Sequence, residues 1–526
     1  MQEHYDWIVI GSGFGGSVSA LRLAEKGFRV LVIEKGRRFG LRDFPANNTE
    51  FRNWMWAPAL GARGIFQMTF LQHVTILHGV GVGGGSLVYA NTLPLPKRSF
   101  FQASSWSHLA DWERELGPHY QTARRMLGAV PYPGKTPGDR VLAQIAQEIG
   151  RPEEHHPTDV AVFFGKPGVE VADPYFGGKG PARVGCTECG ACMTGCRVGA
   201  KNTLDRNYLY LAERLGTEIL AETEVLAVRP KAEGQGYRVE TRGSGAQADT
   251  RTFSADQVVF AGGVMGTLPL LLAMQKDPQG LPKLSKQLGA RVRTNNESLI
   301  GVMAPDSPED FSRGVAITSI LHTDEHSHLE PVRYGAGSSF FRNLMAPHAP
   351  AKNAFVRVGK AIGQLMAHPV RWTRAFTIKQ YAEKTQVLLY MRTLEETLTL
   401  KLGRGIYTGF REGLMSKLDD PKSAPSANLP EASALAKRFA EKVNGVLGSL
   451  FAETVVGAPT TAHILGGCAM GRDAEEGVID TQHRVFGYPG LFVIDGAAVS
   501  ANPGVNPSLT ITALAERAMG LIQAKS

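Results

Sequence analysis

The chain is poor in cysteine, with 5 in 526 residues, and it has no apolar run of the roughly 18–20 residues that a membrane-spanning helix needs. It also has no positively charged leader before an apolar stretch, so the sequence does not predict a secretory signal. We therefore expect a cytoplasmic protein, either free or peripheral to the inner face of the membrane.

Strong charge of one sign is also missing. The chain has 57 Lys and Arg against 49 Asp and Glu, a net charge of +8, and no long basic tract. Nucleic acid is therefore not an expected partner, although contact with anionic lipid is compatible with this charge. The hydrophobic content of 43% excludes wholesale disorder, and the length predicts two or more domains.

Glycine, in contrast, is abundant. The 60 glycines make up about 11% of the chain, against an average usage of about 7%. They follow no collagen period and gather in a few clusters. This distribution predicts tight turns at which backbone approaches another backbone or a ligand.

The first glycine cluster has the full context of a dinucleotide-binding turn. An apolar strand-like run at 7–10 leads into the cluster, a helical pattern follows it, and a second apolar run at 30–33 ends in an acid. In this motif the glycines allow a tight turn, close approach to a pyrophosphate, and close packing of helix on strand, while the acid accepts from ribose hydroxyls. The residues predicted to hold the dinucleotide are Gly11, Gly13, Gly16 and Glu34.

Further strand-to-glycine units at 258–263 and 490–496 predict that one parallel sheet is built from distant parts of the chain. We therefore predict an α/β fold in which a discontinuous Rossmann-type domain comprises residues 1–300 and 456–526. An α+β substrate-binding domain would comprise residues 301–455. Within it, 386–402 is strand-like and 430–451 is helix-like. Asn506 and Pro507 are predicted as N-cap and first residue of the final helix.

Residues 343–376 combine basic and aromatic side chains. Such a stretch can lie on a membrane surface, which would make it a peripheral membrane contact. The favoured alternative is an ordinary solvated face over a core helix.

Taken together, the landmarks resemble the glucose–methanol–choline (GMC) flavoenzymes, and most closely their bacterial cholesterol-oxidase-like branch. The resemblance is carried by five segments, which are residues 11–34, 79–99, 256–266, 463–468 and 495–516. It implies bound FAD and oxidation of an alcohol to a carbonyl. It also implies that the Gly83–Ser86 loop, which includes Gly84, and Asn91 lie near the flavin ring. Val225 would then meet the adenine through its backbone, and Asp495 would lie near the ribityl chain.

The same resemblance implies that His463 and Asn506 form a facing polar pair at the flavin. Alcohol oxidation requires a hydride acceptor, the flavin N5, and a base for the hydroxyl proton, and a neutral imidazole suits the second task near neutral pH. We therefore predict His463 as the base and Asn506 as the amide that orients the alcohol. The expected substrate is a bulky apolar alcohol, such as a sterol, a terpenoid or a long-chain alcohol.

Four of the five cysteines lie together, as Cys186, Cys189, Cys192 and Cys196. Their spacing is that of the iron–sulfur ligands of bacterial ferredoxins, although Arg197 stands where ferredoxins have proline. The pattern favours a 4Fe–4S or 3Fe–4S cluster over free thiols, disulfides or zinc.

A one-electron centre would favour a dehydrogenase that passes electrons to a quinone or carrier protein. The alternatives that remain open are an oxygen-using oxidase without a cluster, a lyase or decarboxylase that retains FAD, and a flavin-containing electron carrier.

Overall fold

The computed structural model describes residues 3–231, 236–244, 249–351, 353–420, 425–426 and 428–525. Its first large sheet has seven strands, of which five are parallel and run in the order β12–β2–β1–β15–β26. β14 and β13 extend it as an antiparallel hairpin beside β15. The strands are β1 (His4–Ile10), β2 (Val30–Ile33), β12 (Glu218–Leu220), β13 (Thr223–Pro230), β14 (Tyr237–Gly243), β15 (Thr250–Phe260) and β26 (Leu491–Val493).

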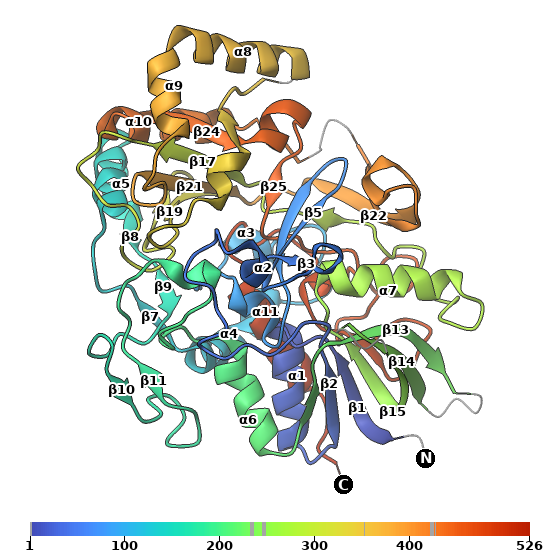
Figure 1. The fold of residues 1–526 in the computed structure, drawn as a ribbon. Coiled ribbons are helices and arrows are strands. Elements are labelled where there is room, and N and C mark those ends of the chain that lie inside the picture. The colour runs from blue at the N-terminus through green and yellow to red at the C-terminus, as the bar shows by residue number, and fades with distance from the viewer. Residues whose placement is uncertain are drawn as a thin grey trace.

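Helices cover this sheet because its parallel strands are apolar on both faces. Trp7, Val9 and Val259 are fully buried, as a central strand requires. On one side α1 packs against α6 and α11, and α11 packs against α4 (Figure 1). α7 contacts β13. These helices are α1 (Phe14–Glu25), α4 (Trp112–Leu127), α6 (Tyr208–Arg214), α7 (Val264–Lys276) and α11 (Ser508–Gly520).

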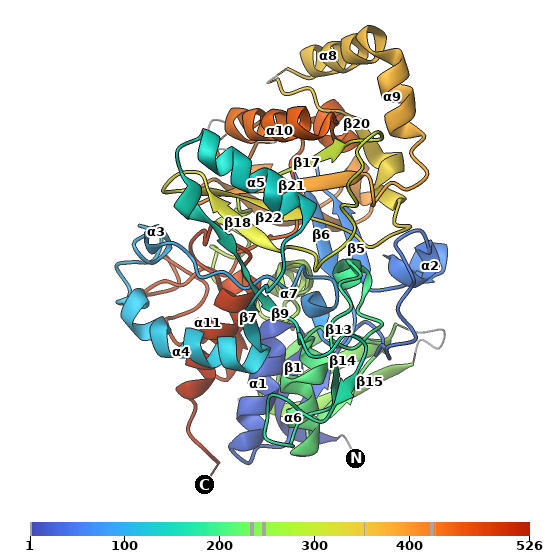
Figure 2. The ribbon, with the colours of Figure 1, turned by 90° about the vertical axis from the view of Figure 1, so that its left-hand side faces the viewer.

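The second seven-stranded sheet is antiparallel, in the order β20–β24–β17–β21–β19–β18–β8. Two helices, α5 and α10, lie alongside it (Figure 2) and share an apolar core with it. The elements are β8 (His155–Pro157), β17 (Ser298–Met303), β18 (Ser319–His322), β19 (Ser327–Val332), β20 (Met345–Pro347), β21 (Thr385–Arg392), β24 (Val446–Leu450), α5 (Pro137–Glu148) and α10 (Pro430–Val443).

Smaller elements connect the two sheets. β5 (Phe66–Phe70), β6 (Thr75–Gly79) and β25 (Thr460–Thr461) form one three-stranded sheet. A second contains β16 (Val292–Arg293), β22 (Thr397–Gly403) and β23 (Gly413–Leu418). The two-stranded pairs join β3 (Trp56–Ala57) with β4 (Ala62–Arg63), β7 (Ala129–Pro131) with β9 (Asp159–Ala161), and β10 (Glu170–Val171) with β11 (Arg183–Val184). The remaining α-helices are α2 (Phe51–Trp54), α3 (Arg98–Phe101), α8 (Ala354–Ala367) and α9 (Pro369–Phe376).

The α/β class and the presence of a Rossmann-type sheet beside a second, α+β part are confirmed. The residue bounds of the two domains stay a prediction, and the second sheet also takes in His155–Pro157 from the N-terminal part of the chain.

Two local expectations were confirmed only in part. The strand-like stretch 386–402 is two strands, β21 and β22, in different sheets. The helix expected over 430–451 ends at Val443, because Asn444 takes a left-handed conformation with φ 52° and the chain continues as β24. None of the helices in the described ranges is long and apolar enough to cross a membrane.

Candidate active site

The glycine turn after β1 brings three backbone segments into contact. Gly11 has φ +102°, and a Cβ on it would lie 2.4 Å from the Ala261 carbonyl oxygen. A Cβ on Gly16 would lie 2.0 Å from the Gly11 oxygen, and one on Gly15 would lie 1.7 Å from the Ile494 oxygen. Any side chain at these three positions would therefore push apart β1, β15 and β26. The motif alone assigned the close packing of helix and strand to Gly16. It did not predict that Gly15 must also lack a side chain.

A large cavity of about 610 Å³ begins at this turn and extends to the second sheet. Of the residues predicted for the site, eight line it, namely Gly11, Gly13, Glu34, Gly84, Val225, His463, Asp495 and Asn506. Four do not, namely Gly16, Gly83, Ser86 and Asn91. Segments that are up to 495 residues apart in sequence thus share one cavity wall.

Glu34 closes the nucleotide end of the cavity and is buried. One of its carboxylate oxygens accepts from the hydroxyl of Ser12 at 2.8 Å, and the other accepts from the backbone N–H of Gly36 at 2.9 Å. The first oxygen also accepts from the N–H of Ser12 at 3.2 Å, so the remaining acceptor capacity toward the cavity lies on the oxygen that accepts from Gly36. Val225 also lines the cavity, beside an irregularity in the pairing of β13 with β14.

The second glycine cluster packs directly on the first. A Cβ on Gly84 would lie 2.6 Å from the Cα of Gly13, so the two turns touch. Ser86 stabilises this turn rather than facing the cavity, since its hydroxyl donates to the Gly83 oxygen at 2.7 Å and accepts from the N–H of Leu204 at 3.0 Å. Asn91 is buried with φ 55°, and neither of its amide atoms has a hydrogen-bond partner within the described residues.

Asp495 connects the turns that follow β15 and β26. Its carboxylate accepts from the N–H of Gly263 at 2.8 Å, the hydroxyl of Thr267 at 2.5 Å and the N–H of Ala497 at 2.8 Å. Burial raises the pKa of Asp495 to about 6, because desolvation outweighs these three donors. Asp495 therefore holds together the two turns that follow β15 and β26, and both turns line the cavity.

His463 and Glu297 form a buried pair at the other end of the cavity. The His463 Nδ1 lies 2.8 Å from a carboxylate oxygen of Glu297, and both residues line the cavity. The second Glu297 oxygen accepts from the hydroxyl of Thr461 and, at 2.9 Å, from the N–H of Ala462. Because a carboxylate accepts, the proton of a neutral His463 lies on Nδ1, and its Nε2 keeps a lone pair.

The carboxylate also sets the basicity of this histidine. Burial alone would lower the pKa of His463, but the charge of Glu297 and its hydrogen bond outweigh burial, and the net effect is a raised pKa. Glu297 gave no signal in the sequence, since it precedes β17 without a recognisable motif.

Asn506 and Glu330 complete the polar end of the site. Asn506 is 5% exposed, and its amide oxygen has no hydrogen-bond partner in the part of the chain that the structure describes. It is not the N-cap of α11 as expected, because Pro507 occupies that position. Glu330 is fully buried on β19, and burial raises its pKa to about 8 against the opposing effects of His463 and Asn506. Glu330 was also missed in the sequence.

The expected iron–sulfur cluster is not supported by the arrangement of the cysteines. Cys186, Cys189, Cys192 and Cys196 are free thiols, and among the described residues no three His, Cys, Asp or Glu side chains form a group that could hold a metal ion. Cys189 is exposed, whereas the other three cysteines pack against an apolar cluster around Val160.

Burial raises the pKa of the Cys186 thiol to about 12 and raises that of Cys192 further. No step of the chemistry below is assigned to them.

Comparison with known proteins agrees with the cavity. Residues 6–351 match the family described as FAD dependent oxidoreductase, and residues 421–515 match the family described as GMC oxidoreductase. The fold and site thus define an FAD-dependent oxidoreductase.

Full-length relatives identify the family. The chain is 46% identical to a cholesterol oxidase of Mycobacterium tuberculosis, covering 99% of this chain and 91% of that protein. It is 42% identical to a cholesterol oxidase of Acinetobacter baumannii, covering 99% and 95%. The solved structure of pyridoxine 4-oxidase from Mesorbium loti has the same fold, with a TM-score of 0.60 at 16% identity over 98% of both chains. The chain belongs to the GMC oxidoreductase family.

The residues around the cavity fit FAD. Gly13 lies at the N-terminus of α1, where free N–H groups favour a phosphate, and nothing lies within 4 Å of a Cβ placed on it. Glu34 keeps acceptor capacity, and Asn506 keeps an unpaired amide oxygen. Gly11, Gly13, Glu34, Gly84 and Asp495 all line this cavity, and their contacts with FAD stay a prediction.

We expect Gly13→Val to reduce FAD affinity roughly tenfold or more, because Gly13 lines the cavity and a Cβ placed on it has no protein atom within 4 Å. Gly13 has φ −72° and ψ −164°, which valine tolerates, so the fold should persist. Titration of the apoprotein with FAD by fluorescence measures the effect. Gly117→Ala, inside α4 and also without neighbours within 4 Å, is the matched control. Unchanged FAD affinity in Gly13→Val would contradict the assignment.

Proposed function

We propose that this protein oxidises a bulky apolar alcohol of sterol size to the carbonyl compound. The main support is the juxtaposition of a carboxylate-oriented histidine and an unpaired amide oxygen with an apolar cavity wall. That wall includes Ile317, Val332, Phe341, Met345, Leu389 and Leu450. The names of the relatives, cholesterol oxidases of two bacteria, agree with such a substrate.

In this proposal His463 accepts the hydroxyl proton at Nε2, while Glu297 holds the ring through Nδ1 and stabilises the resulting imidazolium. Asn506 lines the same cavity, and in this proposal its amide N–H group donates to the alcohol oxygen while His463 accepts the hydroxyl proton. The apolar wall binds the body of the substrate and excludes water from the proton transfer. FAD, when bound, supplies the acceptor for the hydride that leaves the alcohol carbon.

The acceptor of the electrons is proposed to be molecular oxygen. The expectation of a dehydrogenase with a quinone or carrier protein depended on a cysteine-bound cluster, and the cysteine geometry does not support one. Without a relay, direct reaction with oxygen is the simpler course, and the named relatives are oxidases.

An anaerobic titration of the holoprotein tests the proposal. Cholesterol in detergent micelles is expected to bleach the flavin absorption, whereas glucose and choline are not. Admission of air should then release one peroxide per alcohol oxidised, and an iron and acid-labile sulfide assay should find neither in stoichiometric amount. Failure of every apolar alcohol to bleach bound flavin would overturn the alcohol-oxidation proposal. Bleaching without peroxide release would instead favour a dehydrogenase that passes its electrons to another acceptor.

A further inference from the structure

The segment that contains α8 and α9 leaves the body of the protein at the cavity and returns to it. Met345, just before the segment, and Tyr381, just after it, both line the cavity. Between them, α8 lies at the outer edge of the molecule, beyond the second sheet (Figure 1). Figure 2 shows the same outward position from the side. The segment therefore lies next to the substrate-binding part of the cavity without being part of either large sheet.

α8 is oriented with its apolar side chains toward solvent. Phe355 is 88% exposed, Ile362 50% and Met366 77%, and Val370 at the start of α9 is 72% exposed. The first three residues have the spacing of one helix face. A surface helix normally buries this face, so an outward apolar stripe indicates a binding surface.

A buried arginine fixes this orientation. Arg357 is 8% exposed, and its guanidinium donates to the carbonyl oxygens of Thr454 at 2.9 Å and Ala351 at 2.9 Å. Rotating α8 to bury Phe355 would expose Arg357 and break these hydrogen bonds. The outward stripe is thus held in place by specific contacts.

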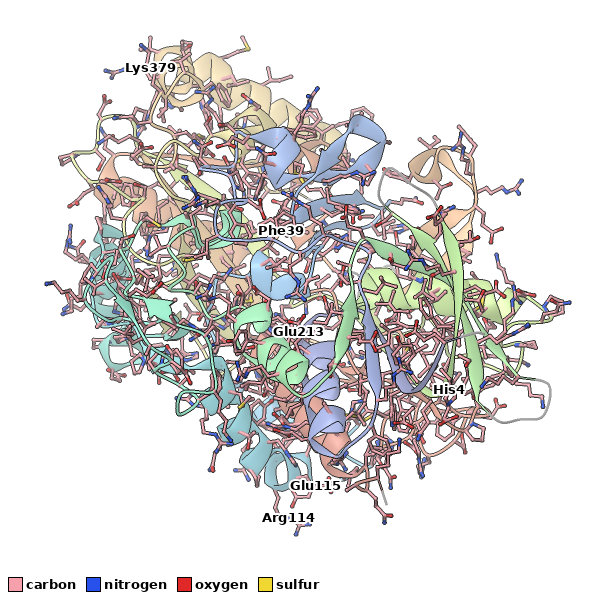
Figure 3. All side chains as sticks on the ribbon, turned by 60° about the horizontal axis from the view of Figure 1, so that its bottom comes forward. His4, Phe39, Arg114, Glu115, Glu213 and Lys379 are labelled. Carbon is pink, nitrogen blue, oxygen red and sulfur yellow. The ribbon has the colours of Figure 1, made fainter. Side chains whose placement is uncertain are left out.

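Cationic side chains predominate around the stripe, although Arg374 on α9 pairs with Asp306 at 2.9 Å. Residues 331–382 contain eight Lys or Arg and no Asp or Glu in 52 positions, although the whole chain has 49 acidic residues. Lys360 lies on α8, and Lys379 lies beyond α9 at the same end of the molecule as these helices (Figure 3). Such a surface attracts anionic groups.

We propose that α8 and the start of α9 dock on an anionic lipid bilayer, with Phe355, Ile362 and Met366 inserted among the acyl chains. An apolar stripe flanked by cations is the composition that binds at a membrane interface. A second copy of this chain is a poorer partner, because a twofold contact would place two predominantly cationic surfaces opposite each other. In the docked position the part of the cavity that Met345 lines lies next to the lipid phase.

Sedimentation of the holoprotein with lipid vesicles tests the docking directly. Binding is expected to vesicles of phosphatidylcholine with about one third phosphatidylglycerol, and to weaken on pure phosphatidylcholine and at high salt. The combined variant Phe355→Ser, Ile362→Ser and Met366→Ser should bind at least tenfold more weakly. The matched control, Leu215→Ser with Leu521→Ser, removes two exposed leucines near the ends of α6 and α11 and should bind as the unmodified protein.

Lys360→Glu with Lys379→Glu should remove the preference for anionic vesicles. Equal binding by the triple serine variant and the unmodified protein would overturn the proposal. So would a concentration-dependent dimer that the serine variant abolishes, since a second copy would then cover the stripe. Vesicle sedimentation does not depend on turnover. A failure of the docking proposal can therefore be distinguished from a failure of the proposed reaction. Flavin absorption and activity on detergent-solubilised alcohol should be the same in all of these variants, which shows that they are folded.

Discussion

His463→Ala is expected to slow reduction of the flavin by substrate about 10²–10⁴-fold, because the variant lacks the base that accepts the hydroxyl proton. Anaerobic stopped-flow absorbance measures this step without interference from the electron acceptor. His348→Gln is the matched control, since His348 is also buried and hydrogen-bonded to serine hydroxyls, but it lies outside the cavity. A His463→Ala rate within about threefold of the unmodified protein would show that another group is the base.

Glu297→Gln separates orientation of the histidine from general structural damage. Removing the charge removes the main effect that raises the pKa of His463, and burial then lowers that pKa. Because the base must be neutral, the acidic limb of the rate–pH profile should move to lower pH. The maximal rate should also fall, since an amide can hold the ring but does not stabilise an imidazolium as a carboxylate does. A slower enzyme with an unmoved acidic limb would contradict the pairing.

The parts of the site that were predictable depend on local backbone chemistry. The turn at Gly11 needs a positive φ, and its flanking apolar strands are read directly from the sequence. Gly15 shows the limit of such a motif. Gly15 must lack a side chain because the Ile494 carbonyl lies beside it, and this carbonyl reaches that position only when β26 pairs with β15.

The parts that were missed depend on pairing between distant strands. Glu297 reaches His463 because β17 and β25 lie close to each other, and no property of its neighbours in sequence announces this contact. For the cysteines, the sequence predicted a shared metal site that the structure does not support. Their spacing is regular along the chain, but the turns at Gly190 and Gly195, both with positive φ, leave Cys189 exposed while the others pack inward. The spacing of the cysteines along the chain therefore did not predict whether their side chains gather at one site.

Glu330→Gln is expected to stabilise the protein, and increasingly so as the pH rises. The nearest ring nitrogen to the Glu330 carboxyl, His328 Nε2, lies 3.4 Å away, and burial raises the pKa of Glu330 to about 8 from an ordinary value of 4.5 despite the hydrogen bond of Asn506. Its favourable contribution is therefore complete below pH 4.5 and is lost as the pH rises to about 8, because the unfolded chain ionises in this range and the folded chain does not. Glutamine, which does not titrate, avoids this loss.

The gain in the free energy of unfolding should be of order 2–4 kcal/mol at pH 8 and should vanish near pH 4.5. Thermal unfolding of variant and unmodified holoprotein at a series of pH values measures the difference. Glu453, whose pKa burial also raises to about 8, titrates in both proteins and cancels. The control is Glu441→Gln on the exposed surface of α10, for which no pH-dependent gain is expected. A difference that stays constant from pH 5 to pH 8 would show that Glu330 is ionised in the folded protein.

A protonated Glu330 in the folded protein affects the chemistry of the site as well as the stability. A carboxyl group that stays protonated beside His463 and Asn506 leaves the histidine with a single charged partner, Glu297, up to about pH 8. Above that pH a second negative charge develops within the same buried region. The unmodified protein should therefore show a second change in flavin-reduction rate near pH 8 that Glu330→Gln lacks. The residue would then lower stability at neutral pH in return for a neutral acid beside the base, a trade that functional sites commonly make.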